Sequence, residues 1–429
     1  MLIAIFLGTL LTGIVIGLPI AYVLVLVGVA LMLHIDFFNA QIVSQNMILG
    51  VDNFLLLAIP FFILAGELMN RGGLSKRIID VALSFFGHRK GGLGYVAIVS
   101  ALILASLSGS AIADSAALAA ILMPMMRKAG YPEGQSVGLL AAGGVIAPII
   151  PPSIAFVVYG AVANVSITKM FLAGIVPGIL MSISLFFAWR VVSAGGEYTT
   201  LPKADWKNRG RTALVGIPAL TLPVVVIGGL RAGIFTPTEA AVIASVFALF
   251  VGVFIYRELD LKGIYEALSS AAMTSATVLF LIGASSVSAW LITTANLPDS
   301  IISAVQPFMD SPALLVAVLV MLTLVMGMVM DFTPLMLIMM PIVVPLCKTA
   351  GVDLVYFGVV FIMAGALGLL TPPVGNVLNV VAGVANTRMD KVITGVLPFL
   401  LAEIVILALL VIFPSLVNIP LEFFNGGAK

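Results

Sequence analysis

The sequence predicts an all-α integral membrane protein, and three observations support this fold class. The 429 residues are 62% hydrophobic and only 9% charged, whereas about a quarter of the residues of a soluble domain are charged. The mean hydropathy is +1.24. Runs such as residues 317–330 are apolar on every side, unlike the alternating strands of membrane barrels, so the spans are predicted to be helices.

The composition argues against several other functions. The net charge of +1 indicates no nucleic-acid partner. The single cysteine, Cys347, excludes an internal disulfide and a cysteine-based metal cluster. The sequence contains no HExxH or P-loop motif, so we expect no enzymatic activity and no hydrolysis of ATP by this chain. An ion gradient or another subunit must then supply the energy for any transport.

The charged residues between the apolar segments predict the topology. Basic residues gather in some connections, whereas connections 34–52 and 295–311 carry aspartates instead. Because Lys and Arg favour the cytoplasmic side, the basic connections are predicted to be cytoplasmic. The first residues lack a basic region and a cleavage-like site, so we interpret them as the start of the first span. The apolar segments are 2–33, 53–70, 92–126, 134–164, 170–190, 213–230, 237–256, 271–294, 312–347, 354–386 and 392–415, and the basic clusters are 71–90, 127–128, 190–211, 257–262 and 388–391.

Two apolar segments, 92–126 and 312–347, begin and end on the same predicted side of the membrane. Each has about 35 residues, which gives two arms of roughly 22 Å, too short for a hydrocarbon core of roughly 30 Å. Their middles, SLSGSAIAD (106–114) and GMVMDFTP (327–334), hold small, hydroxyl and acidic residues. We therefore expect two re-entrant hairpins, the first opening to the cytoplasm and the second to the opposite side.

Residue spacings recur between the two halves of the chain. Asp114 lies ten residues before Pro124, and Asp331 lies ten before Pro341; in both halves a glycine precedes a Pro-Pro pair by 21 residues. Because the hairpins open in opposite directions, the copies form an inverted repeat, which is typical of secondary transporters. The predicted domains are repeat 1 over 1–190, with hairpin 92–126 and a broken helix over 134–164; a cytoplasmic linker and extra span over 191–236; and repeat 2 over 237–429, with hairpin 312–347 and a broken helix over 354–386.

The helix breaks and hairpin tips are candidate sodium sites. Prolines and glycines in 143–153 and 365–376 must unwind each helix, and unwound backbone at membrane depth is tolerated only where it lines a cavity or ligates something. Backbone carbonyls and hydroxyl groups suit Na⁺, a hard cation that takes oxygen ligands. We therefore expect two or more Na⁺ ions, bound at a first site of Ser108, Ser110, Gly144, Ala147 and Pro151 and a second site of Gly327, Gly368, Thr371 and Asn376.

Half-helices that begin near the middle of the membrane would direct their positive N-terminal ends at one place, which favours an anionic substrate group. Candidate substrate-binding residues are Ser153, Asp331 and Asn376. Structural interpretations of the same residues remain open. A serine in a span usually bonds its own i−4 carbonyl, small residues let helices pack closely, and Asp114 and Asp331 each suit a helix N-cap.

Other charged residues receive structural interpretations. Glu67 and Arg71 are spaced to form an i,i+4 pair, and Glu239 suits the first turn of a helix that begins after Pro237. Glu403, within an apolar run, has no assigned role. Segments 71–90 and 257–270 have amphipathic patterns and are predicted to lie along the inner membrane surface. Segments 2–33, 213–256 and 392–415 are rich in Leu, Val and Phe, and are predicted to form a lipid-facing frame around a mobile inner part.

The motifs SLSGSAIADSAALAAILMPMM, IPPS, FTPTEAA and TPPVGN, in this order, resemble the large membrane subunit of the TRAP (tripartite ATP-independent periplasmic) transporters, and most of all the members that carry sialic acid. The resemblance covers essentially the whole chain. It implies a sodium-driven importer of an organic acid in a bacterial inner membrane, with an elevator motion of the hairpins and broken helices. It also implies two protein partners, a small four-helix membrane subunit expected as a separate chain and a periplasmic substrate-binding protein, with membrane lipid around them. The family's sodium sites carry over to the two sets of residues given above.

Two alternatives remain. A stand-alone sodium/dicarboxylate carrier would share paired hairpins and broken helices. An ion-conducting subunit of a membrane complex would use the hairpins as a fixed filter.

Overall fold

The computed structural model describes residues 2–295 and 311–424, which fold as helices and connections with no strand in these ranges. The predicted fold class is confirmed, and seven of the described helices are long and apolar enough to cross a membrane. The helices are α1 (Leu2–Val15), α2 (Ile20–His34), α3 (Ala40–Val51), η1 (Phe54–Leu57), α4 (Ala58–Arg71), α5 (Leu74–Phe86), α6 (Gly92–Ser108), α7 (Ala111–Lys128), α8 (Glu133–Gly144), α9 (Ile154–Ala163), α10 (Ile167–Val192), α11 (Trp206–Arg231), α12 (Pro237–Phe250), η2 (Val251–Ile255), α13 (Leu261–Thr294), α15 (Pro312–Gly327), α16 (Phe332–Thr349), α17 (Leu354–Gly368), α18 (Asn376–Ala385), α19 (Met389–Ile412) and α20 (Ser415–Phe424).

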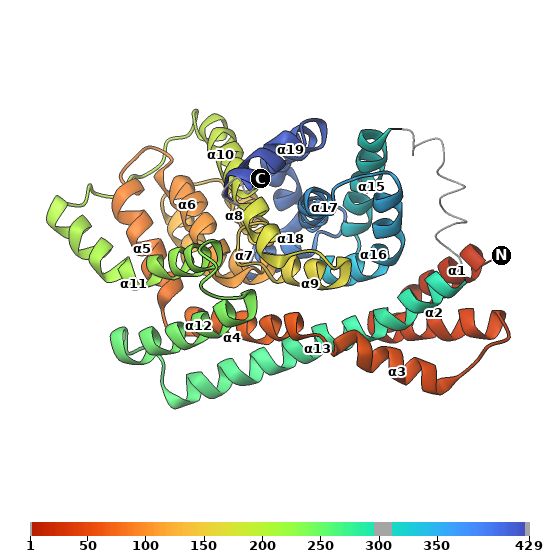
Figure 1. Ribbon diagram of the computed structural model, residues 1–429. Helices are drawn as coiled ribbons and strands as arrows, with labels where there is room; N and C mark the ends of the chain where they lie inside the picture. The colour runs from red at the N-terminus through yellow and green to blue at the C-terminus, as the bar shows by residue number, and fades with distance from the viewer. Residues whose placement is uncertain (1, 296–310, 425–429) are drawn as a thin grey trace.

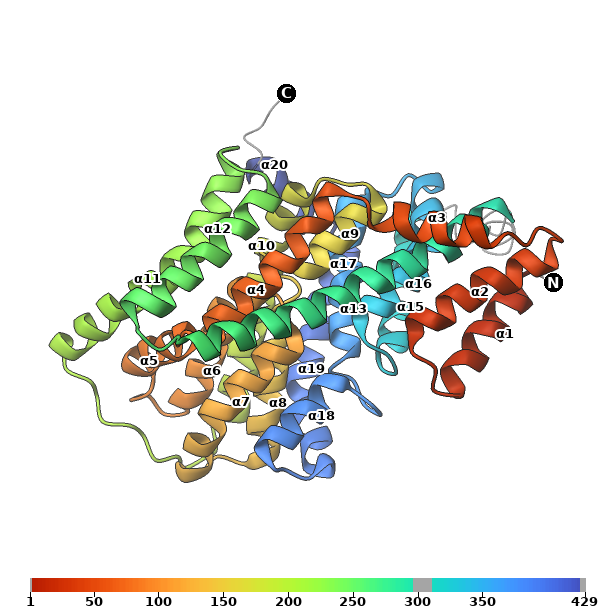
Figure 2. The ribbon, with the colours of Figure 1, turned by 90° about the horizontal axis from the view of Figure 1, so that it is seen from below.

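The helices form two layers. Figure 1 shows α2, α3, α4, α12 and α13 along one side of the molecule, with the helices of the two hairpins and the two broken helices above them. In Figure 2, seen from below, α13 crosses the molecule and passes beside α4, with which it packs. At 1.5 Å per residue its length is about 51 Å. The layer that contains α13 is called the frame below.

The first predicted hairpin consists of α6 and α7. They pack against each other and are joined only by Gly109 and Ser110. Gly109 adopts a left-handed backbone with φ of +62°, a conformation that costs little only for glycine. Ser110 is the N-cap of α7, because its hydroxyl oxygen accepts a hydrogen bond from the backbone N–H of Ala113 at 3.4 Å. The sequence interpretation of Asp114 as the N-cap is therefore wrong, since Asp114 lies one turn inside the helix.

The second hairpin consists of α15 and α16, joined by residues 328–331. Here the interpretation of Asp331 as an N-cap is confirmed. Its carboxylate accepts a hydrogen bond of 2.8 Å from the backbone N–H of Phe332, the first residue of α16. The two hairpins thus reach their tips differently, one through a capping serine and the other through a capping aspartate.

Each hairpin is followed by a helix in two pieces. Helices α8 and α9 are separated by residues 145–153, and α17 and α18 by residues 369–375, and each break contains a cis Pro–Pro bond. The second pieces end alike, because Asn164 and Asn386 both adopt a left-handed backbone at the C-cap. The repeat boundaries and the directions in which the hairpins open stay predictions.

Three long segments differ from the sequence expectation. Segment 2–33 is two helices, α1 and α2, which pack against each other across a turn at residues 16–19. Segment 257–270 was expected as a separate surface helix, but residues 261–270 begin the continuous helix α13. Both aspartates of connection 295–311 lie outside the described residues.

Helix α19, over most of the predicted frame segment 392–415, packs tightly on the broken helix α8. A Cβ added to Gly138 would lie 2.7 Å from the Cα of Val396, and one added to Gly395 would lie 2.1 Å from the carbonyl carbon of Gly134. Because their backbones are in contact, α8 and α19 cannot slide along each other without first separating. The assignment of 392–415 to the frame is therefore corrected, since α19 belongs with α8.

An ion pair and a hydrogen bond link the end of α4 to the start of α13. The predicted pair of Glu67 and Arg71 is present, with 3.5 Å between Oε2 and Nε. The Arg71 guanidinium also contacts Glu266 of α13 at 2.5 Å, and the Ser270 hydroxyl donates to Glu67 at 2.8 Å. This network holds the start of α13 against the end of α4.

Glu239 takes part in a capping box at the start of α12. Thr236 accepts from the Glu239 backbone N–H at 3.3 Å, and the Glu239 carboxylate accepts from the Thr236 N–H at 2.7 Å. The sequence placed Glu239 in this first turn correctly. Replacing the threonine hydroxyl leaves one backbone donor of the helix unsatisfied.

Thr236→Ala is expected to destabilise the protein by about 1 kcal/mol, because the N-cap hydrogen bond is lost. The measurement is the thermal unfolding midpoint of the purified protein, which should fall. Thr277→Ala is the control, because that exposed hydroxyl only bonds its own helix, donating to the Met273 carbonyl at 2.9 Å. Equal midpoints for the two variants would contradict the assigned cap.

Glu403 is fully buried on α19, and neither carboxylate oxygen has a hydrogen-bond partner among the described residues. Its neighbours on the same helix face, Leu400 and Leu407, are buried and apolar. The structure assigns Glu403 no role.

Candidate functional site

The first hairpin tip lies against the first helix break. A Cβ added to Gly109 would lie 3.0 Å from the carbonyl oxygen of Pro152 and 3.1 Å from the Cα of Ser153. A Cβ added to Gly66 of α4 would meet the Cα of Ser108 at 3.4 Å. The tip is therefore held between the break and the frame.

The side chains of this tip surround a buried carboxylate. The Ser108 hydroxyl donates to Oδ1 of Asp114 and also accepts from the backbone N–H of Ser110 at 3.1 Å. Asp114 is only 2% exposed, and its Oδ2 has no hydrogen-bond partner among the described residues. A buried carboxylate oxygen without a partner is costly unless a cation or a proton compensates it.

The remaining residues of the first predicted sodium site lie in or beside the break. Gly144 ends α8 beside α7, since a Cβ there would meet Ser115 Oγ at 1.7 Å and the Ala111 carbonyl at 2.9 Å. Ala147 and Pro151 follow in the break and are buried. The structure thus brings the first turns of α7 against Gly144, while Gly109, the residue between the two predicted serines, contacts the far end of the break.

The second predicted sodium site shows the same approach of tip and break. A Cβ added to Gly368 would lie 2.6 Å from the Cα of Gly327, so the two backbones are in contact. The N–H of Gly375 donates to the carbonyl of Met328 at 3.4 Å. The Thr371 hydroxyl donates to the carbonyl of Leu367, four residues earlier, at 2.7 Å. This is the bond expected if the hydroxyl has a structural role. Its oxygen lone pairs remain able to accept or ligate.

The three predicted substrate-binding residues have different surroundings. Ser153 is fully buried, donates to the Pro148 carbonyl at 2.7 Å and caps α9 through the N–H of Phe156 at 3.4 Å. Its hydroxyl is therefore used within the break. Asp331 is exposed at the second tip, and Asn376 is the half-buried first residue of α18.

A cavity of about 190 Å³ lies where both tips, both breaks and the frame meet. The hairpins and breaks supply the N-terminal residues of three helices, α7, α9 and α16. Helix N-termini carry partial positive charge and free N–H groups, so this arrangement favours an anion. No lysine or arginine is among the described residues that line it, which are Ile63, Gly109, Ser110, Ala111, Ile112, Pro148, Ile154, Ala155, Thr274, Val278, Asp331, Phe332, Thr333 and Leu369.

Several lining residues were not predicted from the sequence. Ile63 comes from α4, and Thr274 and Val278 come from α13. A hydroxyl cluster near 274–277 was the available signal for α13, but only the fold shows that it faces the tips. Ser115 was also missed; its hydroxyl donates to the Ala141 carbonyl at 3.4 Å and so joins α7 to α8.

Two hairpins, two broken helices and a central cavity define a multi-pass membrane transporter. The family profile described as "Tripartite ATP-independent periplasmic transporter, DctM component" matches residues 7–416. The chain belongs to this family of TRAP transporter large permeases.

Relatives and a solved structure agree with this assignment. The chain is 50% identical, over 99% of its length and all of the relative's, to the 2,3-diketo-L-gulonate TRAP transporter large permease protein YiaN of Escherichia coli K12. It is 37% identical, over 96% of both chains, to the sialic acid TRAP transporter large permease protein SiaM of Vibrio cholerae. The crystal structure of the YdaH transporter of Alcanivorax borkumensis matches with a TM-score of 0.61 over 88% of each chain at 15% identity, a likeness of fold alone.

Membership of the family answers three of the sequence predictions, on enzymatic activity, localisation and partners. The family consists of membrane subunits of transporters and not of enzymes, and its members are multi-pass proteins of the inner membrane. TRAP large permeases work with a small membrane subunit and a periplasmic binding protein.

Proposed function

We propose that this chain is the membrane subunit of a sodium-driven importer of an organic acid. The observation that carries the proposal is the cavity on which the N-termini of α7, α9 and α16 converge. With no basic side chain in its described lining, helix dipoles and backbone N–H groups would hold the carboxylate. Ser110 and Asp331 both lie in the lining. The Ser110 hydroxyl would donate hydrogen bonds to, or accept them from, hydroxyl groups of the substrate, and the Asp331 carboxylate would accept hydrogen bonds from them.

The coupling ion is proposed to bind at the two contacts between tip and break. At the first, the unpartnered Oδ2 of Asp114 adds a carboxylate oxygen to the predicted set of Ser108, Ser110, Gly144, Ala147 and Pro151. At the second, the backbones of Gly327 and Gly368 are in contact, and the Thr371 oxygen and the amide of Asn376 lie nearby in the chain. Oxygen ligands of this kind suit a hard cation such as Na⁺.

The size of the cavity favours a small sugar acid. Ligand pockets usually measure roughly 300–1,000 Å³, and this cavity is about 190 Å³. Sialic acid has a longer carbon skeleton and an N-acetyl group, so it is larger than 2,3-diketo-L-gulonate, which the name of the 50% identical relative gives as its substrate. We therefore favour a keto sugar acid of the latter size over the sialic acid expected from the sequence resemblance.

The packing supports an elevator motion. Glycine contacts hold α19 close to α8, whereas even a Cβ added to Gly66 of the frame would lie 3.4 Å from the Cα of Ser108, an ordinary van der Waals distance. If the protein divides between the frame and the remaining helices, the hairpins, the broken helices and α19 can move together against the frame. A separate small membrane subunit would steady the frame, and a periplasmic binding protein would deliver the substrate to the cavity.

The proposal is tested by uptake of radiolabelled 2,3-diketo-L-gulonate into proteoliposomes that contain both membrane subunits, with the binding protein outside. We expect saturable uptake that requires an inward sodium gradient and stops when a sodium ionophore is added. A potassium gradient of equal size is the control and should give no uptake. Sialic acid, tested with its own binding protein, should be transported more slowly.

Other results would point to the alternative functions. Equal uptake without the binding protein would indicate a stand-alone carrier, such as a sodium/dicarboxylate carrier. Flux that neither saturates nor needs sodium would indicate an ion-conducting subunit. Faster transport of sialic acid would contradict the argument from cavity size but not the sodium coupling.

A further inference from the structure

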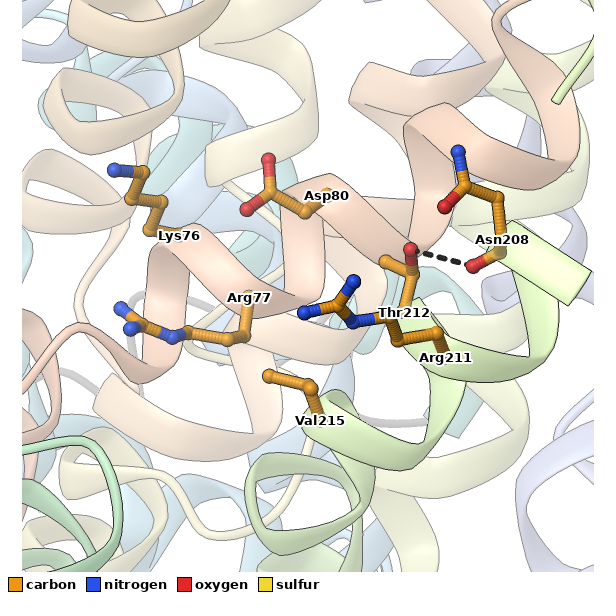
Figure 3. Close-up of a pocket in the computed structure, with 7 residues that line it drawn as sticks. All are labelled: Lys76, Arg77, Asp80, Asn208, Arg211, Thr212 and Val215. Carbon is orange, nitrogen blue, oxygen red and sulfur yellow. Dashed lines mark hydrogen bonds between the residues drawn. The ribbon is translucent and has the colours of Figure 1, made fainter.

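A second cavity, of about 510 Å³, lies between α5 and α11 and shares no described lining residue with the central cavity. Figure 3 shows Lys76, Arg77 and Asp80 extending from α5 and Arg211 reaching across from α11. The helices touch beneath it, since a Cβ added to Gly216 would meet the Val81 side chain at 2.5 Å. The rest of the lining is Asn208, Thr212 and Val215.

The charges in this cavity are not balanced. Arg77 forms an ion pair with Glu258, donates to the Gly73 carbonyl at 3.2 Å and lies over the Tyr256 ring, so it is already occupied. Lys76 and Arg211 are exposed and have no ion pair among the described residues, and together they face one acid, Asp80. The pocket therefore keeps a net positive charge and two available cationic donors, one of which has the planar fork that suits phosphate oxygens.

The surroundings of the cavity indicate an amphipathic ligand. On α11, Leu214 is 67% exposed and Ile217 is 47% exposed, so an apolar outer surface begins within two turns of Arg211. Trp206, 75% exposed, lies just over one turn before Arg211, and exposed tryptophans gather at the level of lipid head groups. A soluble anion would use the basic residues but leave the adjoining apolar surface unused.

We propose that the cavity between α5 and α11 binds the phosphate of an anionic phospholipid. Lys76 and Arg211 contact the phosphate, the amide of Asn208 contacts the glycerol head group, and the acyl chains lie along Leu214 and Ile217. Basic pockets between helices on the cytoplasmic side suit such head groups. The bound lipid would bridge α5 and the extra span α11.

The test uses the purified complex with the small membrane subunit, titrated with phosphatidylglycerol or phosphatidylcholine and observed by native mass spectrometry. We expect phosphatidylglycerol to bind preferentially. Lys76→Gln with Arg211→Gln should weaken its binding roughly thirty-fold, with about five-fold for each single change. Lys76→Arg with Arg211→Lys should keep it. Because both side chains are exposed, the variants are expected to fold, and circular dichroism checks this.

The matched control is Lys203→Gln with Lys207→Gln, which removes the same charge from exposed residues just before α11 and in its first turn that do not line the cavity. This control should bind phosphatidylglycerol like the wild type. Equal losses in both double variants would overturn the proposal, because general charge would then explain the binding. No loss in either would also overturn it. Displacement of the lipid by inorganic phosphate at equal concentration would show that the pocket takes free phosphate and would overturn the lipid assignment.

Discussion

Gly368→Ala is expected to reduce sodium-driven uptake to less than about a tenth of the wild-type rate, because it displaces a tip from its break by about 1 Å. The added Cβ would lie 2.6 Å from the Cα of Gly327 and 2.9 Å from the Leu324 carbonyl. Both obstacles are backbone atoms, so no side chain can rotate away. Helix α15 must separate from α17, and any cation held between them loses ligands.

The measurement is initial uptake in proteoliposomes at saturating sodium and at a series of lower concentrations. Gly383→Ala is the matched control. It makes the same change on α18, in the same half of the chain, where the added Cβ meets nothing within 4 Å. Uptake by Gly368→Ala within twofold of Gly383→Ala would show that the contact between Gly327 and Gly368 does not matter for transport.

Asp114→Asn is expected to raise the sodium concentration for half-maximal uptake by at least roughly tenfold, because hydrogen bonds and contacts to a charged group are worth about 1.5–3 kcal/mol. The change keeps the size of the side chain and removes only the charge. Oδ1 holds the Ser108 hydroxyl, and Oδ2 is the oxygen without a partner. A protein in which Asp114 only fills space would keep its sodium dependence and gain stability.

Asp331→Asn is the comparison for Asp114→Asn. Asparagine also caps helices well, so the hydrogen bond to the N–H of Phe332 and the fold should persist. Asp331 lines the cavity, and its carboxylate would accept stronger hydrogen bonds from the substrate hydroxyls than an amide does. Asp331→Asn should therefore raise the KM for substrate and leave sodium dependence nearly unchanged. If the two variants shift sodium dependence equally, Asp114 has no special part in the first site.

The positions of the site could be predicted from sequence because they depend on local chemistry. Adjacent prolines remove backbone donors and glycine disfavours a helix, so breaks were predictable within 143–153 and 365–376, and the structure has them at 145–153 and 369–375. Small and hydroxyl residues in the middle of two apolar segments marked the tips. The fold supplied the partners, since the contacts of Gly109 with Pro152 and of Gly327 with Gly368 join distant parts of the chain.

Other features could not be predicted, for identifiable reasons. Carbonyl ligands are not encoded by a side chain, so the sequence alone cannot choose among neighbouring positions in a break. Both Ser110 and Asp114 suit an N-cap, and only the observed start of α7 decides between them. Which frame residues line the cavity depends on where α13 passes the hairpin tips, and the sequence does not specify this. The turn that divides 2–33 was detectable, because Gly17 and Pro19 are typical turn residues.

The walls of the central cavity differ in what they would do during each transport cycle. Ser110 and Asp331 belong to the hairpins, so in the proposed motion they travel with the substrate, whereas Ile63, Thr274 and Val278 stay with the frame. Every contact to the frame must therefore break once per cycle. Two of these three side chains, Ile63 and Val278, are apolar and form no hydrogen bonds that would have to break. Substitutions on this wall would therefore alter the turnover rate, whereas substitutions at the tips would alter the affinity for substrate.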